Sequence, residues 1–394
     1  MDSKKRIALI VSHPIQHFCP QYVSFATNKN VTFKVFFGSA LGLKKYYDPN
    51  FKKEISWNNL NLDQFDHCFL NGELALPSDA KLDAPSLDNE LKLFRPNLLI
   101  IYGYFQKLQR RAHRWALLNN VKLAYISDSE LRHRRNRWKE FIKYFFIKNY
   151  FSKIDYFLSV GDANEEFYQH YGVDRNKLIR MHFPIDLPQF EVGFAERTSL
   201  RSQIRERYHI NENQLVLSVV GKLVPWKNQD HIIDAMQVLE REGIYVCLFI
   251  LGSGEMLETW RVKSELLKNS VVHFTGFVSP ENLPAYYAAT DIYVHPASIE
   301  PHSIAVSEAI YMGCPIVISD RCGSYGESDD VLEGKNGLVY EFGNIQKMAN
   351  AIKRLIQIDN NRATFSQMSH QIGVKHQFIS HFKSIEEIVN RAII

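Results

Sequence analysis

The chain has 394 residues, of which 45% are hydrophobic and 23% charged, as expected of a globular protein with two or three domains. Its five cysteines are odd in number and lack C-x-x-C spacing, which argues against a disulfide framework and against a zinc cluster. No apolar run approaches the roughly 18 residues that span a membrane, and the run after Lys4-Lys5-Arg6 is thin for a signal-peptide core. We therefore expect a cytoplasmic protein.

The net charge of +4 combines two unlike halves. Residues 1–186 hold 28 Lys and Arg against 19 Asp and Glu, a net charge of +9, whereas residues 187–394 hold 19 against 24, a net charge of −5. The two halves are therefore expected to have different electrostatic roles.

Short apolar runs alternate with helical patterns along the whole chain. In the first half the predicted strands are 7–12, 32–37, 98–102, 123–127, 156–160 and 178–182. In the second half they are 215–220, 245–251, 271–275, 292–295, 315–319 and 337–340. This alternation is typical of doubly wound α/β domains, and it occurs twice, so we predict two Rossmann-like domains. The break between them is expected at 184–188, where two prolines interrupt regular structure.

The loop after the first predicted strand reads His13-Pro-Ile-Gln16-His17. A nucleotide-binding fold ordinarily has glycines here, because they let phosphate approach the backbone, and this loop has none. Imidazole and amide groups could contact a ligand instead. A purely turn-forming role stays open, above all for His13.

Two acidic residues, Asp128 and Glu130, follow the fourth predicted strand. Such a pair can hold a divalent metal against a diphosphate, but acidic pairs at strand ends are also common by chance. Both interpretations stay open from the residues alone.

Residues 132–153 hold eight Lys or Arg, seven aromatic residues and one acid. Trp138, Phe141, Ile142 and Phe145 recur at helical spacing, which predicts a helix with one apolar face among basic residues. Such a helix can lie on an anionic membrane surface, or its apolar face can pack on the sheet as a crossover helix. Nucleic-acid binding is not supported, since no known nucleic-acid module accompanies the stretch.

In the second half, Gly221-Lys222 ends a predicted strand and Lys227 lies just before a helix predicted from Gln229. Two ammonium groups beside a helix N-terminus suit a diphosphate and can stabilise a leaving nucleoside diphosphate without a metal. A glycine turn at Gly252 follows the next strand and is a weak signal by itself, and the loop 323–326 follows a later strand and could face the same crevice.

The segment from Glu300 to Glu308 lies between two predicted strands, so it is expected to be a loop and the helix that follows it. Ser303 is expected to cap a helix over 304–312, and Gly313 to end it in a left-handed conformation. Two carboxylates at this spacing could hold the two diols of a sugar nucleotide, its hexose and its ribose. Two unrelated surface glutamates are the alternative.

Residues 215–343 resemble the donor-binding domain of family-4 retaining glycosyltransferases, which have the GT-B fold. The resemblance lies in Glu300-x7-Glu308, followed by Ala-Ile-Tyr-Met-Gly-Cys-Pro, and in Gly221-Lys222-x4-Lys227, where relatives often carry Arg first. It implies an α/β protein with two Rossmann-like domains facing a central cleft. Residues 1–186, joined by the C-terminal helix 376–394, would bind the acceptor, and residues 187–375 the nucleotide-sugar donor.

The resemblance also implies a metal-independent hexosyltransferase reaction without a cofactor. A sugar would move with retention from a nucleotide-diphosphate sugar to a saccharide or lipid-linked saccharide, in bacterial surface polysaccharide, lipopolysaccharide or glycoconjugate biosynthesis. The expected catalytic residues are Glu300, Lys222, Lys227 and His17. The expected donor-binding residues are Gly221, Lys222, Lys227, Gly252, Phe277, Val278, Glu300, His302, Ser303, Ile304 and Glu308. The expected acceptor-side residues are His13, Gln16, His17 and Asp128.

The chain departs from the family at several of these positions. His302 and Ser303 replace the Phe and Gly common in relatives, and Pro301 has no N–H to offer a sugar. A sugar-nucleotide epimerase, a sugar-nucleotide-binding protein without catalysis and, less favoured, a glycosidase stay open as alternatives. From the cationic first half we also expect peripheral contact with an anionic membrane at the cytoplasmic face.

Overall fold

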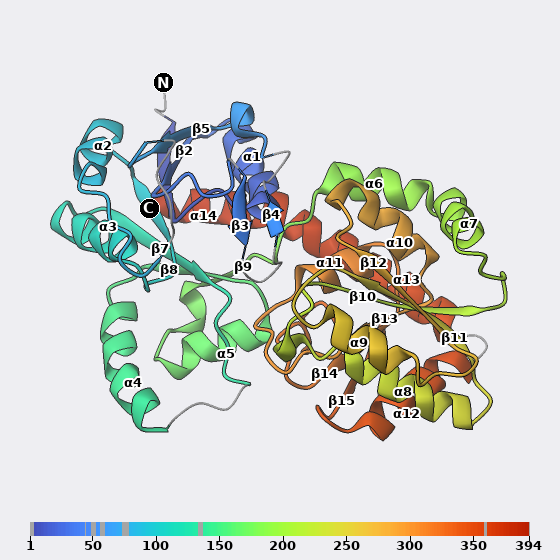
Figure 1. Cartoon of the computed structure of the whole chain (residues 1–394). Helices are drawn as coiled ribbons and strands as arrows, with labels where there is room; N and C mark the ends of the chain where they lie inside the picture. The colour runs from blue at the N-terminus through green and yellow to red at the C-terminus, as the bar shows by residue number, and fades with distance from the viewer. Residues whose placement is uncertain are drawn as a thin grey trace.

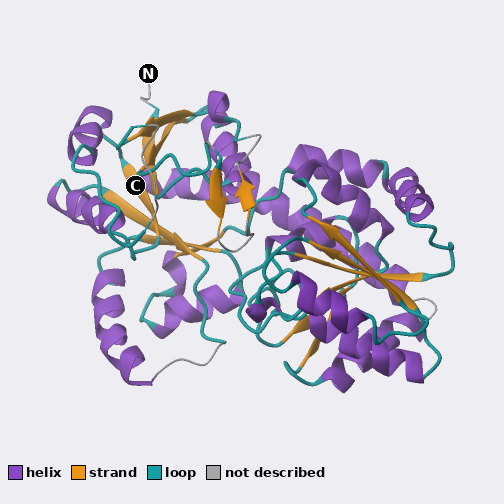
Figure 2. Ribbon diagram, in the orientation of Figure 1, coloured by secondary structure: helices purple, strands orange, loops and turns teal. Residues whose placement is uncertain are grey.

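The computed structural model describes residues 4–43, 45–48, 53–55, 60–72, 79–132, 137–357 and 361–393. It contains a seven-stranded and a six-stranded parallel sheet, each flanked by helices (Figure 2). Figure 1 shows the two domains beside each other, with the C-terminal helix lying against the first. The predicted fold class, two Rossmann-like α/β domains, is confirmed.

The sheet of the first domain has the order β5-β2-β1-β6-β7-β8-β9. Its strands are β1 (Lys5–Val11), β2 (Val31–Phe37), β5 (Asp66–Phe69), β6 (Leu98–Tyr102), β7 (Lys122–Ser127), β8 (Tyr156–Ser159) and β9 (Leu178–Arg180). Its helices are α1 (Cys19–Thr27), α2 (Leu87–Phe94), α3 (Lys107–Leu118), α4 (Arg137–Phe151) and α5 (Asp162–His170). A separate antiparallel hairpin joins β3 (Tyr46–Asp48) to β4 (Lys53–Ile55).

Both faces of this sheet are covered. Successive side chains of a strand point to opposite faces. Accordingly, Ile7 and Leu9 of β1 join the buried cluster that includes α1, whereas Ala8 and Ile10 join the cluster that includes α3 and α4. Burial on both faces explains why these strands read as continuous apolar runs in the sequence.

The sheet of the second domain has the order β12-β11-β10-β13-β14-β15. Its strands are β10 (Leu215–Val220), β11 (Val246–Leu251), β12 (Val271–Gly276), β13 (Ile292–His295), β14 (Ile316–Ser319) and β15 (Gly337–Tyr340). The helices of this half are α6 (Leu187–Ala195), α7 (Arg197–Arg207), α8 (Asp230–Arg241), α9 (Leu257–Ser264), α10 (Leu283–Ala289), α11 (Ile304–Tyr311), α12 (Ile345–Gln357) and α13 (Asn361–Phe378).

The C-terminal segment returns to the first domain. A π-helical turn (Ile379–Lys383) leads from α13 into α14 (Ser384–Ile393). Ile385, Ile388 and Val389 of α14 belong to the same buried cluster as β1 and α1. The first domain is therefore completed by the last residues of the described chain.

The structure differs from the sequence predictions in its short strands and in the capping of α11. The edge strand β5 and the β3–β4 hairpin were not predicted, because both are short and β5 begins with the polar pair Asp66-His67. Ser303 does occupy the N-cap position of α11, but its side chain makes no capping hydrogen bond. Gly313 has the predicted left-handed conformation, with φ of +75°.

Among the described residues, no helix is both long and apolar enough to cross a membrane.

The sheet orders define where a ligand can bind. In the first sheet the chain order reverses at β1, which lies between β2 and β6, and in the second at β10, which lies between β11 and β13. In open parallel sheets, ligands bind at the carboxyl ends of the strands beside such a reversal. The loops after β1 and β10 are therefore expected to face a binding cleft.

Candidate active site between the two domains

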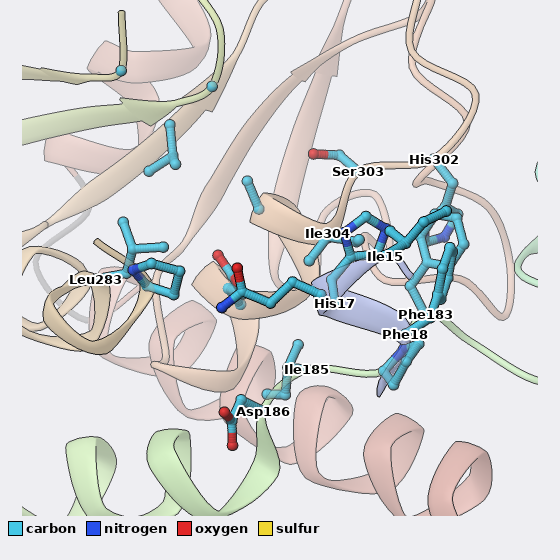
Figure 3. Close-up of a pocket in the computed structure, with 18 of the residues that line it drawn as sticks. Ile15, His17, Phe18, Phe183, Ile185, Asp186, Leu283, His302, Ser303 and Ile304 are labelled. Carbon is cyan, nitrogen blue, oxygen red and sulfur yellow. The ribbon is translucent and has the colours of Figure 1, made fainter. Parts of the chain in front are cut away.

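A cavity of about 620 Å³ lies between the two domains. It is lined by the loop after β1, by residues 183–190 between the domains, and by the loops after β10, β11, β12 and β13. Figure 3 shows side chains from both domains gathered around this space, among them His17 and Phe18 from the first and Ser303 and Ile304 from the second. The cavity therefore lies where the reversal of strand order places a ligand site.

The predicted donor-binding residues line this cavity together. They are Gly221, Lys222, Lys227, Gly252, Phe277, Val278, Glu300, His302, Ser303, Ile304 and Glu308. They come from four separate loops and from the start of α11, spread over 88 positions of sequence, and only the parallel sheet brings them to one edge.

Glu300 forms an ion pair with Lys227 on the wall of the cavity. Its Oε2 also lies 3.1 Å from Nε2 of His295, the last residue of β13, and its side chain is 12% exposed. Burial by itself raises the pKa of a carboxyl, but the charge of Lys227 and the hydrogen bond from His295 lower the pKa of Glu300 to about 2. The group is therefore an ionised acceptor suited to sugar hydroxyls.

Glu308, the second glutamate of the motif, lies inside helix α11. The hydroxyl of Tyr287 donates a hydrogen bond to its carboxylate at 2.8 Å. Burial raises the pKa of Glu308 to about 7, and the nearby charge of Asp186 adds to this effect. The two glutamates of one motif thus have opposite pKa shifts, because only Glu300 has cationic and imidazole partners.

The glycine turns after β10 and β11 approach each other closely. A Cβ atom added to Gly252 would lie 1.8 Å from the carbonyl oxygen of Gly221. Glycine is therefore required at position 252, and the two loops form one continuous backbone surface beside Lys222.

On the first-domain side, a short 3₁₀ turn (Gln16–Phe18) presents Gln16 and His17 to the cavity. Phe18 anchors this turn, because its ring packs against Phe183 at 5.4 Å and Tyr102 at 5.2 Å between ring centroids. The turn occupies the position that glycines take in nucleotide-binding loops, and it offers side chains instead of backbone N–H groups.

Two predicted or alternative site residues lie elsewhere. His13 is outside the cavity lining, and its Nδ1 lies 2.8 Å from the hydroxyl of Ser12. Asp128 lines the cavity, whereas Glu130 is buried and its carboxylate accepts the backbone N–H of Arg132. The two acids after β7 therefore face different surroundings, which disfavours a shared metal.

Several lining or supporting residues were not predicted. Asp186 lies within the interdomain break and Gln189 just after it, and Tyr287 reaches Glu308 from α10. Only His295 carried a usable signal, since it ends a predicted strand five residues before Glu300. The others contact the site through tertiary packing, which no local pattern indicates.

The second domain matches a known protein family. Residues 201–371 match the family model described as glycosyl transferases group 1. A GDP-mannose-dependent alpha-(1-6)-phosphatidylinositol monomannoside mannosyltransferase of Mycobacterium tuberculosis is 30% identical over 178 residues, 43% of this chain and 45% of the relative. The chain thus matches somewhat less than half the length of that relative. An uncharacterised glycosyltransferase of Methanocaldococcus jannaschii is 26% identical over 268 residues, 65% of each chain.

Solved structures share the fold along the whole chain. The Anabaena protein HepE, solved in complex with UDP and glucose, has a TM-score of 0.67 at 15% identity, covering 98% of this chain and 99% of its own. At this identity the likeness concerns the fold, and it extends the GT-B assignment to the first domain. Within its second domain, the chain is therefore similar to the glycosyl transferases group 1 family.

Proposed function

We propose that the protein is a retaining glycosyltransferase that transfers a hexose from a nucleotide-diphosphate sugar to a saccharide or lipid-linked saccharide. The observation that carries the proposal is the joint lining of one interdomain cavity by Glu300, Glu308, Lys222 and Lys227, with His17 and Asp128 on the other domain. A donor bound along the second domain would leave its sugar facing the first.

The proposed mechanism needs no covalent attachment to the protein. Lys222 and Lys227 stabilise the charge that develops on the departing diphosphate. The departing phosphate oxygen takes the proton of the acceptor hydroxyl while that hydroxyl attacks from the same face. Glu300 holds the hydroxyls of the transferred sugar and Glu308 those of the ribose. His17, exposed at the cavity, and Asp128 orient the acceptor.

Names of relatives support the substrate class. The mycobacterial relative uses GDP-mannose and acts on a phosphatidylinositol glycolipid, according to its name. We extend the proposal to a lipid-linked acceptor in the biosynthesis of a bacterial surface polysaccharide or glycoconjugate.

The test begins with thermal-shift screening against UDP-, GDP-, ADP- and dTDP-hexoses. A ligand at about 100 times its dissociation constant adds roughly 2.7 kcal/mol to the free energy of unfolding, so a bound donor is readily detected. The donor so identified is then incubated with candidate acceptors, and the product's anomeric configuration is read by NMR. Retention of the donor's configuration supports the proposal. An inverted product, or an epimerised donor without added acceptor, contradicts it.

We also propose peripheral contact with an anionic membrane through α4. The side chains of Ile147, Tyr150 and Phe151 are buried in the core of the first domain, so this face packs on the sheet. On the outer face, Phe141 and Phe145 are 61% and 58% exposed, and the exposed Lys148 lies one helical turn after Phe145. Exposed aromatic rings among lysines suit the interface of an anionic bilayer.

The arginines that precede or begin α4 do not all support the membrane proposal. Arg132 is engaged with the second domain, where its guanidinium donates to the carbonyl oxygens of Cys322 and Tyr325. Arg134 and Arg135 lie outside the described residues, and so does the side chain of Arg137.

Changing Phe141 and Phe145 together to Ser should reduce flotation with anionic liposomes at low salt while sparing transfer to a soluble acceptor. A matched control changes Val262 and Leu266, which are 63% and 64% exposed in the second domain, to Ser. If the wild type does not float, or the control loses flotation equally, the membrane proposal is wrong.

A further inference from the structure

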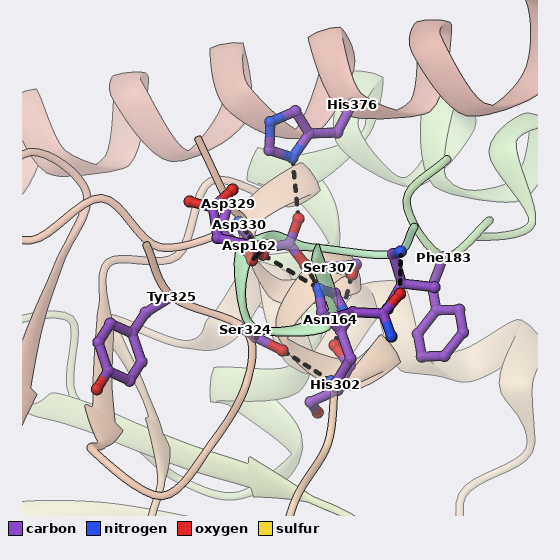
Figure 4. A network of polar contacts seen from close by, with 12 residues as sticks. Asp162, Asn164, Phe183, His302, Ser307, Ser324, Tyr325, Asp329, Asp330 and His376 are labelled. Atoms are coloured by element: carbon purple, nitrogen blue, oxygen red, sulfur yellow. Dashed lines mark hydrogen bonds and ion pairs between the residues drawn. The ribbon is translucent and has the colours of Figure 1, made fainter. Parts of the chain in front are cut away.

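A segment of the second domain, residues 321–330, lies between the first domain and the Glu300–Glu308 element. We call it the bridging segment. It follows β14 and makes hydrogen bonds both to the Glu300–Glu308 element and to the first domain. Figure 4 shows part of this polar network around His302, Asp329 and Asp330.

Toward the donor site, the bridging segment holds the backbone of residues 300–303. Cys322 pairs with Glu300 in an isolated parallel bridge, and the N–H of Gly323 donates to the Glu300 carbonyl oxygen at 2.8 Å. The hydroxyl oxygen of Ser324 accepts the N–H of Ser303 at 2.7 Å. The position of the Glu300 backbone is therefore set by this segment.

The approach is close enough to require glycine. A Cβ atom on Gly323 would lie 1.7 Å from the carbonyl oxygen of Pro301. Side chains add to the contact further along, because Asp329 Oδ1 lies 3.1 Å from His302 Nε2 and the Ser307 hydroxyl donates to Asp330 at 2.6 Å.

Toward the first domain, Arg132 holds the start of the same segment. Its guanidinium donates to the carbonyl oxygens of Cys322 at 2.7 Å and Tyr325 at 2.8 Å, and it lies 3.8 Å from the centroid of the Tyr325 ring. In return, the guanidinium of Arg321 donates to the carbonyl oxygen of Arg132 at 2.8 Å.

The N-terminus of α5 holds the end of the segment. The Asp162 carboxylate accepts the N–H of Ser328 at 2.8 Å and its hydroxyl at 2.7 Å, and the Asp162 N–H donates to Asp329 at 2.6 Å. Arg180 donates both to Asp162 at 2.6 Å and to the Ser328 carbonyl oxygen at 2.9 Å. A Cβ atom on Gly326 would lie 2.2 Å from the Asp162 carboxylate, so this contact also requires glycine.

We propose that the bridging segment couples domain contact to the donor sugar site. Arg132, Asp162 and Arg180 are then positioning residues for Glu300, although none of them lines the cavity. The inference rests on the proposed role of Glu300 at the transferred sugar. We expect the ribose end of the site to depend less on this contact, because the Glu308 carboxylate is held by the Tyr287 hydroxyl within the second domain.

This arrangement has a chemical consequence. The sugar would be held for reaction only when the acceptor domain is apposed to the donor domain. A donor bound to separated domains would keep its nucleotide contacts but lack an ordered Glu300, so it would be protected from wasteful hydrolysis.

The experiment compares Asp162→Ala and Gly326→Ala with the wild type. Both variants disturb the same interdomain contact, the first by removing hydrogen bonds and the second by inserting a methyl group. We expect nucleoside diphosphate affinity within about twofold of wild type, and kcat with the intact donor reduced at least tenfold. The double variant should be no worse than the more affected single variant, because both act on one contact.

The matched control is Asp83→Ala. Asp83 is also an arginine-paired aspartate, accepting from Arg111 at 2.8 and 2.9 Å, but the pair lies within the first domain. Melting temperatures verify that each variant is folded. Wild-type turnover in both interdomain variants, a tenfold loss in the control, or an equal loss of nucleoside diphosphate affinity would overturn the inference. If the wild type itself binds no nucleotide sugar, the proposed function is wrong. This outcome differs from the failure of the present inference, in which the wild type binds and turns over the donor.

Discussion

Lys227 and Glu300 form an ion pair within the cavity, although 73 positions separate them in sequence. One is the proposed ligand of the diphosphate and the other the proposed ligand of the sugar. In the unliganded protein each therefore compensates the charge of the other. If these two roles are correct, donor binding would divide the pair between the diphosphate and the sugar of one ligand, and binding of the phosphate by Lys227 would free the Glu300 carboxylate for the sugar.

The first prediction concerns Lys227→Met. Removing the ammonium should weaken nucleoside diphosphate binding by roughly 1.5 to 3 kcal/mol, the range for a charge-assisted hydrogen bond. The pKa of Glu300 should also rise from about 2, because the charge that lowers it is gone. Calorimetric titration at pH 7.5 measures the affinity. Lys227→Arg is the control, since it keeps the charge, and an unchanged affinity in Lys227→Met would remove this residue from the phosphate site.

The second prediction separates the two glutamates. Glu308→Ala should weaken nucleoside diphosphate binding by roughly 1.5 to 3 kcal/mol, because it removes a charged acceptor from the ribose. Glu300→Ala should leave that affinity unchanged or raise it, since Lys227 loses its intramolecular partner, while turnover of the intact donor falls. Equal losses of nucleoside diphosphate affinity in the two variants would refute this division of roles.

The third prediction concerns pH and the affinity for nucleotide. Since the pKa of Glu308 is raised to about 7, much of this group is protonated below neutral pH. A protonated carboxyl is a poorer acceptor for ribose hydroxyls, so nucleoside diphosphate affinity should fall as pH decreases from 8 to 6. Calorimetry across this range should show a steeper dependence in the wild type than in Glu308→Gln, where only the ionisation of the terminal phosphate of the nucleotide, near about pH 6, should remain. The same slope in the variant would assign the titration to another group.

The fourth prediction concerns the same group and stability. The folded carboxyl has a pKa of about 7 against an ordinary value of 4.5, so between these values the folded state binds more protons than the unfolded state. The free energy of unfolding should therefore decrease as pH rises from about 4.5 to about 7, as far as Glu308 contributes. Glu308→Gln should be more stable than wild type at pH 8 by roughly 1 to 3 kcal/mol, since one pKa unit corresponds to 1.36 kcal/mol and partial exposure screens the effect. Urea unfolding at pH 8 and pH 4.5 measures the difference, which should shrink at the lower pH.

The fifth prediction is that transfer survives treatment with EDTA. Two lysines beside the nucleotide can supply the charge stabilisation for which other enzymes use a metal. Initial rates before and after chelation test this. Activity that disappears and returns with Mg²⁺ or Mn²⁺ would instead make Asp128 a candidate metal ligand, and Asp128→Asn would then abolish the metal response.

The sequence by itself determined the strands, the domain repeat and the motifs that line the cavity. Buried parallel strands require apolar, β-branched runs, so the twelve predicted runs all correspond to strands. Glu300 and Glu308 lie on one loop and helix, so their relation follows from local spacing. Lys222 and Lys227 were found for the same reason, since both flank one strand-to-helix turn.

Only the tertiary structure decided which of these groups meet. The partner of Lys227 is Glu300, one face of α4 is exposed while the other is buried on the sheet, and Gly326 meets Asp162 across the domain boundary. The return of α14 to the first sheet likewise brings Val389 to β1 from the far end of the chain. Such contacts depend on how whole elements pack, and sequence periodicity is a local property that carries no information about which distant surfaces face each other.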